Sequence, residues 1–396
     1  MNSIKTLEDA EVKGKKVLLR VDFNVPLDKD IVSDDTRIRA ALPTIRYLCD
    51  KGARLILMSH LGRPAGNGFE EKYSLAPVAK CLSKLLGTPV LFSRDTVGEE
   101  AKKISSTLED SQVLMLENLR FEQGEKKNDL EFCQQLAALG DIYIDDAFGV
   151  SHRSHASTTG VAKLLPSFGG YLLTHEINTL QSMLENPKRP FVAILGGSKV
   201  SDKIKVIDAL IDVCDTLIIG GGMCFTFLLA QGYSVGTSLK EDDLIESCKK
   251  MIIKAQNAGV ELLLPVDVIV ADKFSEDARS ITVSVDKIPD DMMGLDIGPE
   301  TEKIYEQAIK SAETVFWNGP MGVFEMPAFE SGTKKVAQAV SLNTVCDSII
   351  GGGDSVAAVN KFGLADKMSF ISTGGGASME LVQGENLPGV EVLRPR

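Results

Sequence analysis

The sequence lacks any apolar run long enough to cross a membrane. A spanning helix needs roughly 20 consecutive apolar residues, and no stretch of this chain approaches that length. The first residues, MNSIKTLEDAEVKGKK, contain no apolar segment of the kind found in secretory signals. We therefore expect a globular protein of the cytoplasm.

Cysteine is scarce and shows no pairing pattern. The chain has 7 cysteines, an odd number, and none of them are spaced as CxxC. Neither a disulfide framework nor a zinc site is indicated, and the pattern fits a reducing compartment.

Basic residues are in the minority, since 43 lysines and arginines face 55 aspartates and glutamates, for a net charge of −12. This balance argues against a nucleic-acid-binding surface. With 396 residues, of which 44% are hydrophobic and 25% charged, the chain is long enough for about two domains with substantial cores.

One central segment, Tyr171–Glu185 (YLLTHEINTLQSMLE), has the period of an amphipathic helix. Glycines 169 and 170 precede it, and Asn186 and Pro187 stop it. Its apolar positions are Leu173, Ile177, Leu180 and Leu184. Because the loops before it carry Arg, His, Asp and Asn and those after it carry glycines and lysines, we expect it to join two lobes. An ordinary connecting helix within one α/β domain is the alternative.

Short apolar runs alternate with helical patterns along the whole chain, which predicts parallel sheets covered on both faces. One such helix is Leu75–Leu86, with Ser74 as N-cap and Gly87 as its stop. The predicted strands are Lys16–Val21, Arg54–Ser59, Val113–Leu116 and Ile142–Ile144, then Phe191–Leu195, Thr216–Ile219, Glu261–Leu264, Thr314–Trp317, Ser348–Ile350 and Ser369–Ile371. The fold class is α/β, as two Rossmann-like three-layer lobes with parallel sheets joined by the central helix.

Ligands of such sheets bind beyond the carboxyl ends of the strands, and in the first half these ends carry cationic side chains. They include Arg37, Arg63, Arg120, Arg153, His60, His152 and His155. A guanidinium offers paired donors that suit phosphate and carboxylate oxygens. Each arginine alone could form a surface salt bridge, and each histidine a structural hydrogen bond. Together they predict a site for a small, multiply anionic molecule.

In the second half the strand ends carry glycine runs, such as GGSKVSDK (Gly196–Lys203) and GGGDS (Gly351–Ser355). Glycine lets the backbone present N–H groups to a ligand, and a helix N-terminus adds positive potential. Asp354 could hold Mg²⁺. Neither GxxxxGK[ST] nor GxGxxG occurs, so a nucleotide bound here would be held in a less familiar way.

The motifs KVLLRVDFNVP, SHLGRP, ENLRF, GGSKVSDKI, FWNGPMGVFE, GGGDS and STGGGAS, in this order, resemble those of the phosphoglycerate kinase family over nearly the whole chain. The resemblance implies a hinge-bending enzyme of glycolysis and gluconeogenesis. Such an enzyme transfers a phosphoryl group between 1,3-bisphosphoglycerate and MgADP, giving 3-phosphoglycerate and MgATP. The departures are mild: SHRSH stands where AHRAH is common, and Ser198 where alanine is common.

The resemblance also implies residue roles and lobe boundaries. Residues 1–170 would bind phosphoglycerate and be joined by residues 385–396, while residues 171–186 form the hinge helix and residues 187–384 bind the nucleotide. The phosphoglycerate residues would be Asp22, Asn24, Arg37, His60, Arg63, Arg120 and Arg153. The nucleotide residues would be Lys203, Asn318, Glu325 and the turn Gly352, Gly353, Asp354 and Ser355, with Asp354 on Mg²⁺ and Gly220, Gly221 and Pro320 lining the adenine slot.

Phosphoryl transfer needs positioning and charge neutralisation, with little covalent chemistry. Both nucleophiles, a carboxylate and a phosphate oxygen, are already ionised, so no general base is required. As catalytic residues that stabilise the charge we predict Arg37, Lys199, Lys203 and the backbone N–H groups around Gly375.

Two other classes stay open. A bilobal small-anion binding protein would share the hinge but would not bind MgADP. A nicotinamide dehydrogenase would show changes in cofactor absorbance. We expect a monomer with no nucleic-acid or membrane partner.

Overall fold

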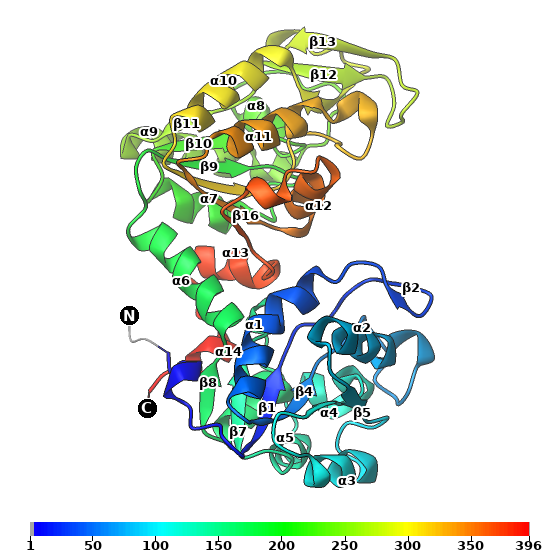
Figure 1. Ribbon diagram of the computed structural model, residues 1–396. Helices are drawn as coiled ribbons and strands as arrows, with labels where there is room; N and C mark the ends of the chain where they lie inside the picture. Colours follow the sequence, from blue (N-terminus) through cyan, green and yellow to red (C-terminus); the bar gives the residue numbers. More distant parts are fainter. Residues whose placement is uncertain (1–3, 396) are drawn as a thin grey trace. The chain divides into compact units, whose positions relative to one another are not determined.

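The computed structural model describes residues 4–395, which form two compact units. Within these residues, the first unit runs to Thr179 and includes the terminal segment from Asn386, and the second comprises Leu180–Glu385. Helix α6 (Tyr171–Glu185) has the predicted bounds and contributes residues to both units (Figure 1). Its apolar stripe is buried at Leu173, Ile177 and Leu180.

The first unit contains a six-stranded parallel sheet in the order β5-β6-β4-β1-β7-β8. Its strands are β1 (Lys16–Arg20), β4 (Arg54–Met58), β5 (Val90–Phe92), β6 (Val113–Met115), β7 (Ile142–Asp145) and β8 (Ser167–Gly169). The chain adds β4 on one side of β1 and β7 on the other. This reversal beside β1 puts the loops after β1, β4 and β7 at one edge of the sheet, where such folds bind ligands.

The second unit repeats this plan with the order β11-β10-β9-β15-β16-β17. Its strands are β9 (Phe191–Leu195), β10 (Thr216–Ile219), β11 (Glu261–Leu263), β15 (Thr314–Asn318), β16 (Asp347–Gly351) and β17 (Phe370–Ile371). In Figure 1, α10 (Pro299–Lys310) and α11 (Ser331–Leu342) lie on one side of the sheet and α7 (Ile204–Ile211) on the other. Central strands such as Phe191–Leu195 are buried along their whole length, as expected for a sheet covered on both faces. The predicted α/β class, with two parallel sheets, is therefore confirmed.

Several small strands were not predicted. An antiparallel sheet pairs β12 (Asp267–Ala271) with β13 (Ser280–Ser284) and β14 (Met293–Ile297). A hairpin joins β2 (Leu27–Asp28) and β3 (Ile31–Val32). The edge strands β5 and β8 were also missed.

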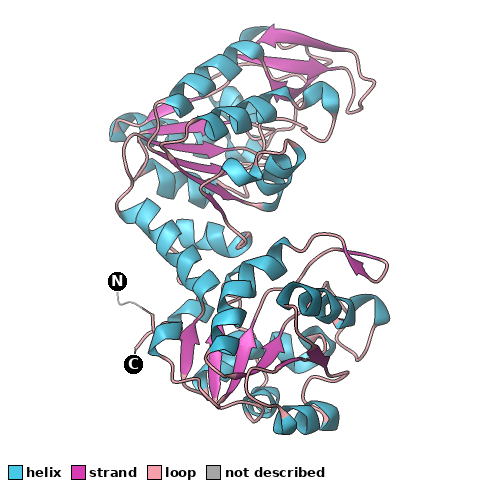
Figure 2. Ribbon diagram, viewed as in Figure 1, coloured by secondary structure: helices cyan, strands magenta, loops and turns pink. Residues whose placement is uncertain are grey.

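The remaining helices surround the sheets (Figure 2). They are α1 (Thr36–Asp50), α2 (Ala76–Leu86), α3 (Glu99–Thr107), α4 (Gln123–Lys127), α5 (Leu130–Ala137), α8 (Cys224–Ala230), α9 (Ile245–Ala258), α12 (Gly353–Lys361), α13 (Gly376–Val382) and α14 (Pro388–Glu391).

One local prediction about a helix end needs correction. Helix α2 stops at Gly87 as predicted, with φ +74, but its N-cap is Leu75 rather than Ser74. The hydroxyl of Ser74 donates to Glu117 at 2.7 Å and accepts the Ala76 N–H at 3.3 Å, so it still satisfies one N–H group at the start of the helix. Helix α14 follows α13, and there the Gly389 N–H donates to Ser151 O at 2.8 Å.

Across residues 4–395, every helix is too short or too polar to span a bilayer. The 7 cysteines all remain free thiols.

Candidate active site

The predicted anion-binding residues of the first unit lie after its strands and in the first turn of α1. Asp22 and Asn24 follow β1, and His60 follows β4. Arg120 lies in a short 3₁₀ helix, Leu119–Phe121, that follows β6. The sheet topology therefore collects these side chains at one edge of a single sheet.

Arg37, in the first turn of α1, is paired with Asp22. Its Nη1 lies 2.7 Å from Asp22 Oδ2, and the Arg37 side chain remains 35% exposed. The other carboxylate oxygen of Asp22 lies 3.8 Å from His60 Nδ1, which is too long for a hydrogen bond. The Asp22 carboxylate thus lies between Arg37 and His60, two residues that are predicted to bind the substrate.

Asn24 and Arg120 both hold the backbone of Gly62. The Gly62 N–H donates to Asn24 Oδ1 at 2.8 Å, and Arg120 Nη1 donates to Gly62 O at 2.7 Å. Gly62 has φ +60, and a Cβ there would lie 2.4 Å from the Tyr73 ring. The loop that carries His60 and Arg63 is therefore fixed by two predicted ligands and needs glycine at its turn.

The electrostatics of this cluster are those of crowded positive charge. Burial, followed by the nearby charges of Arg20, Arg120 and Arg37, holds the pKa of His60 well below its usual value. Burial and the same kind of neighbours lower the pKa of His155 to about 4. Burial and the charge of Arg20 lower the pKa of Arg120 to about 10. A bound anion would offset the part of each shift that comes from the neighbouring positive charges.

Arg63 and Arg153 are exposed. The charge of Arg153 contributes to the lowered pKa of both Arg120 and His155, so Arg153 lies near the cluster. Among residues 4–395, no hydrogen bond or ion pair of the Arg63 side chain links it to the others.

Two charged residues beside the cluster, Arg20 at the end of β1 and Glu125 in α4, were not among the predicted site residues. Arg20 is 1% exposed and Glu125 also 1%. The available signal was a charged residue closing an otherwise apolar strand, since arginine is almost never fully buried unless it is paired.

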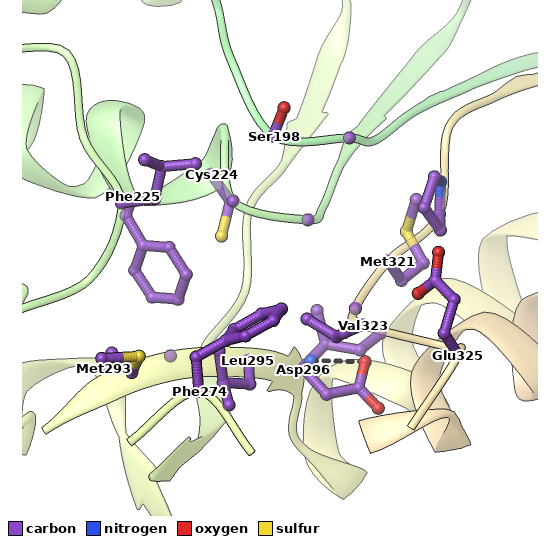
Figure 3. A pocket seen from close by; sticks show the side chains of 18 of the residues that line it. Ser198, Cys224, Phe225, Phe274, Met293, Leu295, Asp296, Met321, Val323 and Glu325 are labelled. Atoms are coloured by element: carbon purple, nitrogen blue, oxygen red, sulfur yellow. Dashed lines mark hydrogen bonds between the residues drawn. The ribbon is translucent and has the colours of Figure 1, made fainter. Parts of the chain in front are cut away.

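In the second unit, a cavity of about 470 Å³ lies where several glycine loops follow the strands. The residues after β9 (Gly197 and Ser198), after β10 (Gly221) and after β15 (Pro320) line it together. Asp354 and Glu325 also line it. Figure 3 shows the rings of Phe225 and Phe274 at one end of the cavity and the Glu325 carboxylate at the other.

Other predicted nucleotide residues build the loops instead of lining the cavity. Asn318 is 2% exposed, and its Nδ2 donates to Gly351 O at 2.8 Å. The Ser355 hydroxyl accepts the Gly319 N–H at 2.6 Å. Gly352, at φ +88, would place a Cβ 2.5 Å from Asn318 Nδ2. A Cβ at Gly220 would lie 2.4 Å from Met321 Sδ, so both glycines are required by close packing.

Lys203 and Asp354 are electrostatically coupled. Lys203 is the N-cap residue of α7, and burial lowers its pKa to about 8, against the raising effect of the Asp354 and Asp202 carboxylates. Lys199 and Gly353 are exposed. Gly375 is the N-cap of α13, with φ +51.

The apolar end of the cavity was not anticipated from the sequence. Phe225, Phe274, Met293 and Leu295 line it, the last two from β14 of the antiparallel sheet. A Cβ at Gly294 would lie 1.9 Å from the Phe225 ring. This flat apolar end suits a planar ring. Met293 and Leu295 belong to the antiparallel sheet, outside the strand-end loops from which the site was predicted.

A carboxylate also belongs to the cavity wall. Asp296 lines the cavity and is 3% exposed. Burial raises its pKa well above the usual value, although it accepts hydrogen bonds from Gly332 N at 2.8 Å and Ile297 N at 2.9 Å. It thereby ties β14 to the N-terminus of α11.

The residues near Asp354 are compatible with Mg²⁺ carried by a nucleotide. Residues 4–395 contain no group of three or more His, Cys, Asp or Glu side chains that could hold a metal. Mg²⁺ in phosphate sites is commonly held by one or two carboxylates, with phosphate oxygens and water completing the shell. A single carboxylate at the edge of this cavity meets that requirement.

The comparisons with known proteins agree on one family. The sequence profile of the phosphoglycerate kinase family matches residues 7–385. The chain is 55% identical to a phosphoglycerate kinase of Nostoc sp. over 395 residues, covering 99% of this chain and 98% of that one. It is 54% identical over 395 residues to "Phosphoglycerate kinase 3, cytosolic" of Arabidopsis thaliana, with the same coverage of 99% and 98%.

Solved structures give the same result. A phosphoglycerate kinase from Coxiella burnetii has a TM-score of 0.91 at 43% identity, and 99% of each chain is covered. A phosphoglycerate kinase from Pyrococcus horikoshii has a TM-score of 0.81 at 31% identity, with 98% of each chain covered. The chain is therefore a kinase and belongs to the phosphoglycerate kinase family.

Proposed function

We propose that the protein catalyses reversible phosphoryl transfer between 1,3-bisphosphoglycerate and MgADP, giving 3-phosphoglycerate and MgATP. We propose glycolysis and gluconeogenesis in the cytoplasm as its setting and a monomer as its form. One observation carries the proposal: the first unit gathers Arg20, Arg37 and Arg120 around the buried His60, and their charges add to the effect of burial in lowering the pKa of His60. Such a cluster of positive charges favours the binding of a multiply charged anion.

The anion cluster suits 3-phosphoglycerate because that molecule carries a phosphate and a carboxylate. In the proposal Arg63, Arg120 and Arg153 hold these groups with Asp22, Asn24 and His60. The pairing of Arg37 with Asp22 at 2.7 Å keeps the arginine oriented while it is still 35% exposed. Arg37 then neutralises charge on the transferring group.

The second unit supplies the nucleotide side of the reaction. The glycine-lined cavity takes the base between Gly221, Pro320 and the apolar end, and Glu325 takes the ribose. Lys203 and Lys199 neutralise phosphate charge, together with the backbone N–H groups around Gly375. Asp354 would hold Mg²⁺, which, when bound, shields the charge of the phosphates.

Transfer requires the two ligands to approach each other, because the proposed donor and acceptor sites belong to different units. In-line attack needs reacting atoms about 3–3.5 Å apart. We therefore include closure of the units about α6, completed when both substrates are bound. Exclusion of water then protects the phosphoryl group from hydrolysis.

The test is a coupled assay of ATP-dependent phosphorylation of 3-phosphoglycerate. We expect ADP to form only when 3-phosphoglycerate is present, and the reverse reaction to make ATP from 1,3-bisphosphoglycerate and MgADP. Binding of 3-phosphoglycerate without any turnover would instead favour a small-anion binding protein.

A further inference from the structure

A continuous chain of buried hydrogen bonds runs behind His60. The Ser157 hydroxyl, in the one-turn helix Ala156–Gly160, donates to Glu125 Oε1 at 2.6 Å. Arg20 Nε donates to Ser157 Oγ at 2.9 Å, and Arg20 Nη2 lies 3.1 Å from His60 Nδ1. All four side chains are nearly inaccessible to solvent, with His60 the most exposed at 3%.

The direction of each bond in this chain is fixed by the groups themselves. Glu125 accepts at both oxygens, since Oε2 also accepts the Ser157 backbone N–H at 3.0 Å. The Ser157 proton is therefore directed to Glu125, and its lone pairs face Arg20. A guanidinium can only donate. Nδ1 of His60 must then be the acceptor, and a neutral imidazole with an accepting Nδ1 carries its proton on Nε2.

Arg20 is fully engaged in this arrangement. Its Nε binds Ser157, its Nη2 binds His60, and its Nη1 donates to the backbone oxygen of Val21. Arg20 therefore holds the neighbouring His60 ring through its Nη2 group. No hydrogen bond within residues 4–395 uses His60 Nε2, so this N–H remains available at the anion cluster.

We propose that Glu125 and Ser157 are positioning residues, which orient Arg20 so that it holds His60 as a neutral ring with its proton on Nε2. The substrate anion then meets a directed N–H donor. This inference rests on the proposed function, in which the cluster binds phosphoglycerate.

Asp22 favours the alternative position of the His60 ring proton, on Nδ1. Its Oδ1 lies 3.8 Å from the same Nδ1 of His60, and a small ring rotation would let a protonated Nδ1 donate to it. A carboxylate partner favours the protonated nitrogen, whereas Arg20 favours the bare one. Loss of the Glu125–Ser157 support should therefore move the proton from Nε2 to Nδ1.

The test is ¹⁵N nuclear magnetic resonance of the full chain labelled in histidine, which separates protonated from bare ring nitrogens. The chain has 4 histidines, and His60→Gln identifies the signals of this one. In wild type we expect Nε2 protonated and Nδ1 bare. Only the assignment of the signals needs a variant, and a protonated Nδ1 with a bare Nε2 in wild type would overturn the proposal.

Variants then test the two positioning residues. In Ser157→Ala and Glu125→Gln we expect a substantial Nδ1-protonated population and a KM for 3-phosphoglycerate raised about tenfold, the scale of one hydrogen bond to a charged group. The KM for nucleotide should not change. Ser157→Thr keeps the hydroxyl and should retain the wild-type tautomer. Ser105→Ala, which removes a buried hydroxyl bonded to the Lys102 oxygen of its own helix, is the matched control.

An unchanged His60 tautomer in a folded Ser157→Ala protein would overturn the role of Ser157 and Glu125. Failure of the proposed function is distinguishable, because it would show as missing turnover in wild type whatever the ring signals are.

Discussion

Arg37 Nη1 and Asp22 Oδ2 lie 2.7 Å apart, so the arginine that we assign to the transferring phosphoryl group is oriented by a carboxylate of its own unit. The pair is partly exposed, with 35% of the Arg37 side chain accessible. Such pairs contribute little to stability. In this site the pair instead orients the Arg37 guanidinium.

The first prediction follows from this pair. Arg37→Ala should lower kcat by roughly 10³ to 10⁵, the range for arginines that neutralise a transferring phosphoryl group. The melting temperature should barely change. Arg39→Ala is the control, because Arg39 lies on the same helix and pairs with Asp35 at 2.8 Å on the surface. Near-normal turnover by folded Arg37→Ala would remove this arginine from the mechanism.

The second prediction concerns the pH dependence of nucleotide binding. Burial lowers the pKa of Lys203 to about 8, so its positive charge is present below that pH and is lost above it. The affinity for MgADP should therefore fall as pH rises through about 8. Lys203→Arg keeps a charge at all these pH values and should abolish the decline. Calorimetric titrations at several pH values measure the MgADP affinity of wild type and of Lys203→Arg. The same pH dependence in both proteins would contradict the assignment of Lys203 to the nucleotide phosphates.

The third prediction separates the metal ligand from its neighbour. Asp354→Asn should raise the Mg²⁺ concentration needed for nucleotide binding, because a neutral amide is a poorer ligand for a hard cation. Affinity for 3-phosphoglycerate should be unaffected. Asp202→Asn removes the same charge near Lys203 from a residue that does not line the cavity. If Asp354→Asn and Asp202→Asn need the same Mg²⁺ concentration for nucleotide binding, Asp354 is not the Mg²⁺ ligand.

The fourth prediction concerns stability and the start of α6. Asp146 is 0% exposed and accepts the Leu173 N–H at 3.2 Å. Burial raises its pKa from 3.8 to about 7. The folded state therefore binds the carboxyl proton of Asp146 more tightly than the unfolded state does. The stability gained from this tighter binding is complete below pH 3.8 and is lost as pH rises through about 7.

Wild type should therefore lose stability relative to Asp146→Asn across that pH window, by a few kcal/mol at most. Denaturant unfolding at closely spaced pH values measures this difference. The exposed Asp366→Asn controls for the loss of one charge. A difference that does not vary with pH would show that Asp146 does not titrate in this range.

The sequence predicted most strands of the two parallel sheets, because strands buried on both faces must be continuously apolar, as Phe191–Leu195 is. It could not predict β13, whose residues are mostly exposed and whose place depends on pairing with β12. Edge strand β5, only half buried, left an equally weak signal.

The same limit applies to the site. Residues that follow strands, such as His60 and Asp354, could be predicted as site residues because the ends of parallel strands gather at one edge. Ser157 and Glu125 were not found, because their role depends on a three-dimensional chain of hydrogen bonds between segments 32 residues apart. Gly220 and Asn318 were predicted to contact the nucleotide, and this stays a prediction; the contacts that the structure shows for them hold the loops at the cavity.

The central claim is that each unit binds one substrate and that transfer requires both to be brought together. Shifting a two-state equilibrium from 1:99 to 99:1 takes roughly 5.5 kcal/mol of differential binding. If two ligands share this energy, either one alone should give at most partial closure.

Small-angle X-ray scattering tests this claim most directly, using the protein alone, each binary complex, and the ternary complex of MgADP with 3-phosphoglycerate. We predict that the radius of gyration falls fully only in the ternary complex, with at most a partial decrease for either ligand alone. Identical radii of gyration in all four samples would contradict the account.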